Sequence, residues 1–361
     1  MYKSMSKISI LIPDGESPFA FHVLNCLSKI KNIEVHFLSR EKVTLTKYSK
    51  KTASFHFLPS HQTLLQGVKQ VCEKRKIDLC LPVDTEGIYY FSKYQEQVNE
   101  FTKLLLIQPA KELMRVSDKK QFSDYLQEKQ LSHPPTITTP MQFEKEIQNF
   151  SFPVLVKPRL AGNGEGIIKL LDIEELATYM KQNTNFFEEF LIQEYIEGED
   201  IDCSVLCKDG KILANTIQKG LSRNAKAYKP AEIIEFVHHS EVFETATKLM
   251  SSLQWNGIAH IDMRIRKFDG AVQIIEMNPR FWGSIEGSLY VGVNFPYLTC
   301  LASLGEEFSK PEFRESKYMS ALAAIKGILR GKPAVNFFQE TNWLSYLKDP
   351  MPVLVKMFQQ D

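Results

Sequence analysis

Residues 274–280 combine side chains that could act together on a metal ion and a phosphate. Glu276 and Asn278 lie two positions apart in a stretch that reads as a strand. Both side chains should point to one face, because side chains alternate along an extended chain. Pro279 has no N–H to give to a sheet and should end the strand. Arg280 then presents a planar five-donor group that suits phosphate or carboxylate.

A second carboxylate comes from the stretch just upstream. Residues 259–265 and 272–277 read as two strands joined by a short turn, which would bring Asp262 opposite Glu276 and Asn278. Carboxylate and amide oxygens suit a hard cation such as Mg²⁺, which keeps part of its shell for water and substrate phosphates. An ordinary hairpin with polar edge residues explains this segment alone equally well.

Composition and charge restrict the class of protein. The chain has 361 residues, of which 43% are hydrophobic and 24% charged, so we expect two or three domains. The net charge is +1 with no basic block, so nothing favours nucleic acid or an anionic membrane as a partner. The six cysteines lack metal-site spacing, and the apolar run at the N-terminus is too short for a signal peptide. These features predict a cytoplasmic location.

The N-terminal part alternates strand and helix patterns up to residue 110, which predicts a parallel, Rossmann-like sheet. Ligands of such sheets bind beyond the carboxyl ends of the strands. This places Asp14, Asp84 and Glu86 at a candidate pocket. No GxGxxG motif follows the first strand, so we do not expect a dinucleotide. Capping of the next helix is an equal alternative for Asp84 and Glu86.

Two lysines lie where an anion would explain them. Lys119 is in the first turn of a predicted helix, where a cation is mildly unfavourable unless it is solvated or faces an anion. Lys157 lies near the end of an apolar strand, and a loop with glycines at alternate positions follows. Such a loop can approach and cradle phosphate oxygens, although a flexible hairpin is the alternative. The glycines are Gly162, Gly164 and Gly166.

In this order, the pieces resemble the ATP-grasp superfamily, from Pro109 to about residue 300. They comprise Asp118-Lys119, the strand 154–158 with its glycine loop, the run 193–200, and Asp262, Glu276, Asn278 and Arg280. The run 276–284 is most similar to carbamoyl-phosphate-synthase-like and amino-acid-ligase members. Glu165 within a phosphate loop departs from what the family's chemistry favours.

The resemblance implies a mixed α/β and α+β fold. We expect a Rossmann-like pre-ATP-grasp domain, two ATP-grasp lobes that carry the glycine loop and the metal site respectively, and a helical C-terminal tail. The expected limits are 1–110, 111–192, 193–310 and 311–361. The tail lies outside the resemblance, and packing, a dimer contact or partner docking would each account for it.

The resemblance also implies roles for individual residues. Nucleotide phosphates would be bound by Lys119, Lys157, Gly162, Gly164 and Gly166. Adenine would meet Glu194 and the backbone of Tyr195 and Ile196, and the ribose would meet Asp200, or Glu199 if the register differs by one. One or two Mg²⁺ ions, or Mn²⁺ in their place, would be held by Asp262, Glu276 and Asn278. The transferred phosphoryl group would be steadied by Arg280 and Lys157.

The activity that the resemblance implies is ATP-dependent, ADP-forming ligation of a small carboxylate to an amine through an acyl phosphate. Carbamoyl-phosphate-type chemistry and a non-catalytic ATP-binding regulator are the alternatives. No GxSxG elbow or Cys/His pairing suggests a protein nucleophile instead. A homodimer is left open. The substrate pocket is expected to draw on Asp14, Asp84, Glu86, Arg223, Trp282, Gly283 and Ser284.

Overall fold

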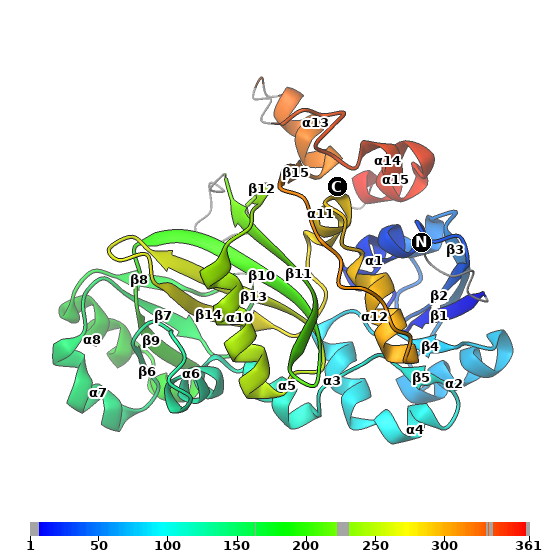
Figure 1. Ribbon diagram of the computed structural model, residues 1–361. Helices are drawn as coiled ribbons and strands as arrows, with labels where there is room; N and C mark the ends of the chain where they lie inside the picture. The colour runs from blue at the N-terminus through cyan, green and yellow to red at the C-terminus, as the bar shows by residue number, and fades with distance from the viewer. Residues whose placement is uncertain (1–6, 163, 222–230, 330, 332–334, 359–361) are drawn as a thin grey trace.

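The computed structural model describes residues 7–162, 164–221, 231–329, 331 and 335–358. Within them the chain forms three sheets that follow one another along the sequence (Figure 1). This arrangement confirms the predicted mixture of α/β and α+β structure. None of the described helices is both long and apolar enough to cross a bilayer.

The first sheet has five parallel strands in the order β3-β2-β1-β4-β5. Its strands are β1 (Ile8–Ile12), β2 (Ile33–Ser39), β3 (Thr52–Phe57), β4 (Leu79–Cys80) and β5 (Lys103–Leu104). Its helices are α1 (Ala20–Leu27), α2 (Leu64–Arg75), α3 (Thr85–Lys93) and α4 (Gln95–Asn99), with a 3₁₀ turn, η1 (Thr46–Tyr48). The apolar runs in β1 and β2 are buried, as expected for a parallel sheet covered on both faces. The predicted Rossmann-like alternation is therefore present.

Two helices, α5 (Ala110–Ser117) and α6 (Lys119–Glu128), lead to a four-stranded sheet in the order β6-β9-β7-β8. Its antiparallel strands are β6 (Thr136–Ile137), β7 (Val154–Pro158), β8 (Ile168–Leu170) and β9 (Phe190–Glu194). The short helices α7 (Pro140–Glu146), α8 (Ile173–Gln182) and α9 (Phe186–Glu189) and the turn η2 (Ile147–Asn149) lie beside it. The four-stranded sheet and its short helices have their own hydrophobic cluster, separate from the main core that includes α5 and α6.

The third sheet is antiparallel, with six strands in the order β14-β13-β10-β11-β12-β15. These are β10 (Gly198–Lys208), β11 (Lys211–Gly220), β12 (Ile233–Phe236), β13 (Gly257–Arg266), β14 (Val272–Asn278) and β15 (Ser316–Met319). Helix α10 (Ser240–Leu253) packs across it, and α11 (Ile285–Tyr290) follows β14. Helix α12 (Phe295–Leu304) contacts β10 and β13 as well as β4 and β5, so it joins this sheet to the N-terminal one (Figure 1).

The C-terminal part, predicted as a helical appendage from residue 311, contains a strand before its helices. Strand β15 pairs with β12 and buries Tyr318 and Met319, because β12 would otherwise leave an open edge. The helices α13 (Ala321–Leu329), α14 (Trp343–Lys348) and α15 (Met351–Phe358) follow. Helices α14 and α15 lie beside the N-terminal unit, near α1 and β3 (Figure 1). The four predicted domain limits stay predictions; β9 continues to Glu194, two residues beyond the predicted limit at 192/193.

Strands β10 and β13 approach each other closely at their shared end. Gly198 lies opposite Arg266, and a Cβ built on Gly198 would come within 1.9 Å of the carbonyl oxygen of Ile265. Only a glycine can occupy this position without moving backbone atoms.

We predict that Gly198→Ala lowers the free energy of unfolding by about 1–3 kcal/mol, because the added methyl group must push the two strands apart. Gly162→Ala is the matched control, since no atom lies within 4 Å of a Cβ built there. Chemical denaturation of both variants checks this, and equal stability of the two would contradict the close approach.

Candidate nucleotide and metal site

Strands β13 and β14 carry the residues that the sequence proposed as metal ligands. Asp262 lies directly opposite Glu276, and His260 lies opposite Asn278, so all four side chains share one face of the sheet. The Nδ2 atom of Asn278 donates to Asp262 Oδ2 over 3.2 Å. The hairpin therefore places Asp262, Glu276 and Asn278 together as predicted.

Strand β10 adds a third carboxylate to this face, which the sequence analysis did not identify. Asp202 is the cross-strand partner of Asp262, so Asp202, Asp262 and Glu276 form a row across three neighbouring strands. The alternation of Asp200, Asp202 and Ser204 in a strand pattern was the signal that could have revealed it.

The same register places the two candidates for the ribose contact, Asp200 and Glu199, on opposite faces of the sheet. Asp200 lies opposite Arg264, and its Oδ1 accepts a hydrogen bond from the Nη1 atom of Arg264 over 2.7 Å. Asp200 therefore shares the face of Asp202 and Asp262. Glu199 is opposite Ile265 and points to the other face of the sheet.

Asp202, His260 and Asp262 each contribute a potential ligand atom, and these atoms all lie within 4.8 Å of one another. His260 Nε2 lies 3.4 Å from Asp262 Oδ1 and 3.8 Å from Asp202 Oδ2. Burial raises the pKa of Asp202 to about 7 and that of Asp262 well above its usual range, and it lowers the pKa of His260 to about 3. Neighbouring carboxylates add to the rise at Asp262. A cation placed here would relieve this crowding of negative charge.

Two lysines face these carboxylates from outside the large sheet. Lys119 is the first residue of α6, and its Nζ atom lies 3.3 Å from the Oε2 atom of Glu276. Lys157, on β7, is 5% exposed and donates to the Oε1 atom of Gln193 over 2.6 Å. The pKa of Lys157 is lowered to about 8, chiefly by burial; the charge of Glu276 opposes this shift, and the charge of Lys119 adds to it. A buried ammonium whose hydrogen-bond partner is a neutral amide is well placed to receive an anion.

The glycine loop lies between β7 and β8, next to Lys119. The ammonium group of Lys119 donates a hydrogen bond to the carbonyl oxygen of Ala161 at the start of this loop. Gly164 and Gly166 have positive φ values of 68° and 70°, which L side chains rarely adopt. Glu165 is exposed to solvent, which accommodates its charge in the loop.

The expected adenine contacts are partly occupied by protein groups. Glu194 accepts a hydrogen bond from the backbone N–H of Ser151 over 2.7 Å, and the N–H of Tyr195 donates to the carbonyl of Pro153 over 3.1 Å. Two cations lie near the Tyr195 ring: the ammonium nitrogen of Lys169 is 4.0 Å and the guanidinium carbon of Arg264 is 5.3 Å from its centre. The contacts of Glu194, Tyr195 and Ile196 with a base stay predictions.

Arg280 lies where the large sheet meets the N-terminal unit. Its Nη2 atom donates to the Oδ1 atom of Asn278 over 3.2 Å, and its Nη1 atom donates to the Phe281 carbonyl over 2.9 Å. The guanidinium carbon lies 4.5 Å from the centre of the Phe19 ring. Burial lowers the pKa of Arg280, and the charge of Asp84 is the largest influence in the other direction. Arg280 thus links the candidate metal site to the first sheet.

The expected substrate residues of the first sheet have structural partners. Asp14 accepts hydrogen bonds from the backbone N–H groups of Val83 and Asp84, both over 2.9 Å, and burial raises its pKa to about 7. Asp84 caps α3 through the N–H of Thr85, which agrees with the alternative raised from the sequence. Glu86 is exposed in the first turn of α3. Arg223 lies outside the described residues.

The residues after Arg280 divide into a buried and an accessible group. Trp282 is 2% exposed, and its ring stacks on His260 at 5.5 Å and meets Phe295 edge-on. It supports His260 and offers little surface to a substrate. Ser284 donates to Gln218 Oε1 over 3.0 Å, and a Cβ built on Gly283 would meet no atom within 4 Å.

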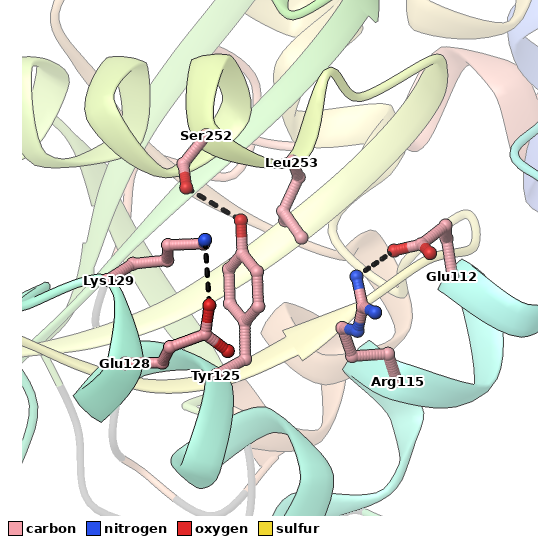
Figure 2. A pocket seen from close by; sticks show the side chains of 7 residues that line it. All are labelled: Glu112, Arg115, Tyr125, Glu128, Lys129, Ser252 and Leu253. Atoms are coloured by element: carbon pink, nitrogen blue, oxygen red, sulfur yellow. Dashed lines mark hydrogen bonds and ion pairs between the residues drawn. The ribbon is translucent and has the colours of Figure 1, made fainter.

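A pocket of about 320 Å³ lies elsewhere, between α5, α6 and the end of α10 (Figure 2). Its charged side chains form two ion pairs, Arg115 with Glu112 and Lys129 with Glu128, while the Tyr125 hydroxyl bonds to Ser252. Figure 2 shows these partners directed toward one another. The pocket is therefore distinct from the candidate site and presents no unpaired charge to a ligand.

Comparisons with known proteins indicate the family and the fold. Residues 186–327 match a family model described as "ATP-grasp in the biosynthetic pathway with Ter operon". A D-alanine–D-alanine ligase of Acetivibrio thermocellus is 29% identical over 148 residues, which are 37% of this chain and 39% of that enzyme. The chain thus spans less than half the length of this relative.

Solved structures extend the similarity over most of the chain. The biotin carboxylase domain of Hydrogenobacter thermophilus 2-oxoglutarate carboxylase, in complex with MgADP, ADP and bicarbonate, has a TM-score of 0.67 and 14% identity, covering 87% of this chain and 74% of that one. An L-amino acid ligase from Bacillus licheniformis has a TM-score of 0.60 and 19% identity, covering 86% and 76%. The family model over residues 186–327, the relatives and the fold together indicate an ATP-grasp protein.

Proposed function

We propose that the protein is an ATP-dependent ligase that joins a small carboxylate to an amine and forms ADP and phosphate. One observation carries the proposal. The lysines Lys119 and Lys157 face the carboxylates Asp262 and Glu276 across a single site, so that cationic and anionic groups meet there. A polyphosphate and a divalent cation together would satisfy both sets of charges.

The donor set fits a magnesium ion, since Asp262, Glu276 and Asn278 offer the oxygen ligands that a hard cation prefers. Bound there, Mg²⁺ or Mn²⁺ would neutralise charge on the phosphates during transfer. In the structure, Glu276 pairs with Lys119, and Asn278 accepts a hydrogen bond from Arg280 through its Oδ1 atom. These partners must be exchanged when a cation and a nucleotide bind.

The remaining nucleotide contacts follow from the same face and the adjoining loop. Lys157 and the glycine loop would hold phosphate oxygens. Asp200 would accept from the ribose hydroxyls, because the register places it on the Asp262 face. Arg280 would bind the phosphoryl group as it moves to the substrate, at the boundary with the first sheet.

The proposed reaction proceeds in two steps. A carboxylate oxygen attacks the γ-phosphorus of ATP, the bond to the β-phosphate oxygen breaks, and ADP leaves. The amine then attacks the carbonyl carbon of the acyl phosphate and loses a proton, and phosphate leaves with the carboxylate oxygen. Such chemistry depends on charge neutralisation and positioning more than on a protein nucleophile.

The relatives support the general reaction. The D-alanine–D-alanine ligase and the L-amino acid ligase are named for joining amino acids. Bicarbonate is a second candidate for the acid, because the biotin carboxylase structure contains it. A carbamoyl-phosphate-type reaction would use that acid.

Phosphate release is the direct test. Purified protein is incubated with ATP and Mg²⁺, with pools of amino acids, other amines, small carboxylates and bicarbonate added singly and in pairs. We expect release that requires an acid and an amine together and is absent in Glu276→Ala. No release from any pool, with ATP still bound, would contradict the ligase and favour a regulatory protein.

A matched pair of variants on β10 tests the nucleotide contact. We predict that Asp200→Asn raises the dissociation constant of MgATP about tenfold, because it weakens hydrogen bonds to a charged acceptor. Glu199→Gln, one residue away on the opposite face, should change it less than about twofold. Calorimetric titration checks both, and the reverse order would shift the ribose contact to Glu199.

The lowered pKa of Lys157 predicts a pH effect. The pKa is about 8 in the folded protein and 10.5 in the unfolded chain, so the unfolded chain holds more protons between these values. The free protein should therefore gain stability from Lys157 as the pH rises through this range. MgATP affinity should fall over the same range, by at most about tenfold per pH unit, because phosphate requires the protonated ammonium.

The control for this effect is Lys157→Met, which keeps the length of the side chain without its charge. MgATP should bind this variant at least about 30-fold more weakly, given about 2–5 kcal/mol for a buried charge contact. Its residual affinity should not depend on the Lys157 titration. An affinity profile from pH 7 to 10 that is equally steep in both proteins would contradict the assignment.

A further inference from the structure

A buried carboxylate outside the proposed chemistry lies shortly after Arg280. Glu286, on α11, is 5% exposed and accepts three hydrogen bonds. Its Oε1 atom receives them from His22 Nδ1 over 2.7 Å and Asn25 Nδ2 over 3.1 Å, and its Oε2 atom receives one from Asn342 Nδ2 over 2.7 Å. Burial would raise the pKa of Glu286, but these bonds outweigh it and leave the pKa lowered.

The three donors come from two distant parts of the chain. His22 and Asn25 belong to α1 of the first sheet, whereas Asn342 directly precedes α14 in the C-terminal part. Both amides are held at their other end as well. Asn25 Oδ1 accepts from the Lys51 ammonium over 2.6 Å, and Asn342 Oδ1 accepts from the N–H of Ala321 over 2.9 Å. Glu286 therefore joins parts of the chain whose own positions are already fixed.

The start of helix α1 lies close to Arg280 in space. Phe19, the residue before α1, lies with its ring 4.5 Å from the Arg280 guanidinium. Ser17, two residues before Phe19, donates a hydrogen bond to Asp84 Oδ2 over 3.0 Å. Because Arg280 precedes α11 and Phe19 precedes α1, the contact between Phe19 and Arg280 depends on how these two helices sit against each other.

We propose that Glu286 is a positioning residue for the ligase reaction, which locks α1, α11 and the C-terminal segment together so that Phe19 meets Arg280. The inference rests on the proposed function for the role of Arg280. It also makes residues around Asn342, beyond the 186–327 family match, part of the unit that builds the site.

Other contacts keep α1 in place when Glu286 is changed. The Nδ2 atom of Asn294 donates to the Cys26 carbonyl over 2.9 Å, and the apolar side chains of α1 are buried in the main core. Variants of Glu286 should therefore fold, with α1 attached less tightly. This separates positioning from the formation of the fold.

The kinetic test compares Glu286→Gln and Asn342→Ala with Ser345→Ala. Ser345 is in the same segment, but accepts its hydrogen bond from Lys29, outside the Glu286 network. In the phosphate-release assay, we expect KM for the acid that supports release to rise about tenfold in the first two variants. Small misplacements near the reacting groups can change kinetic constants by this much or more. KM for MgATP and all constants of Ser345→Ala should stay within about twofold. Equal changes in both KM values would overturn the inference.

A double mutant tests the route through Phe19. If Glu286 acts by placing Phe19, then Phe19→Leu combined with Glu286→Gln should raise KM for the acid no more than the larger single change. Additive effects would show that Glu286 acts independently of Phe19 and would overturn the positioning role.

Hydrogen exchange gives a readout that needs no substrate. In Glu286→Gln we expect faster amide exchange in peptides covering 14–22 and 278–285, with peptides covering β7 and β9 unchanged. Faster exchange confined to α11 and the segment around Asn342, or spread over the whole chain, would contradict the proposal. This result stays decisive even if no pool supports phosphate release, so a failure of the proposed function is distinguishable from a failure of the positioning role.

Discussion

The candidate site depends on the antiparallel register that aligns Asp202, Asp262 and Glu276 across β10, β13 and β14. Burial is the main cause of the raised pKa values of Asp202 and Asp262, and at Asp262 the charges of Asp202 and Glu276 add to the rise. A shift of one residue would turn every side chain of a strand to the other face, so the backbone hydrogen bonds of the sheet hold this charge in place. The close approach at Gly198 fixes the end of the same pair of strands.

The opposite charges come from another sheet and another helix. Lys157 is buried at the end of β7 and Lys119 begins α6, so the site forms only where the small sheet meets the large one. Burying an ammonium against a neutral amide costs free energy in the unliganded protein. A bound phosphate would offset that cost. We therefore assign Lys157 and Lys119 to nucleotide binding and not to the stability of the fold.

A third part of the chain completes the surroundings of Arg280. The first sheet supplies Phe19 and Asp84, and the C-terminal segment reaches the same region through Asn342 and Glu286. The C-terminal segment therefore bears on the surroundings of Arg280 through α1, which Glu286 joins to Asn342.

Much of this arrangement was predictable from local patterns. Alternation of strand and helix predicted the parallel sheet, and the spacing of Asp262, Glu276 and Asn278 predicted their hairpin. Asp202 and His260 were missed because their importance depends on cross-strand partners, which the sequence around them does not specify. The strand character of residues 316–319 was missed for the same reason: β15 forms against the free edge of β12. The backbone partners of Asp14 come from a segment about 70 residues away and needed the fold to be seen, whereas the capping role of Asp84 was an alternative that the sequence already raised.

The transfer of oxygen from the acid to phosphate tests the central claim most directly. Pooled acids labelled with ¹⁸O in the carboxylate are incubated with ATP, Mg²⁺ and the amine pool, and the phosphate formed is examined by mass spectrometry. An acyl-phosphate mechanism predicts one ¹⁸O atom in each phosphate released by ligation. Unlabelled phosphate would show that water attacks ATP, and label in AMP would show adenylation; either result would contradict the proposed ligase.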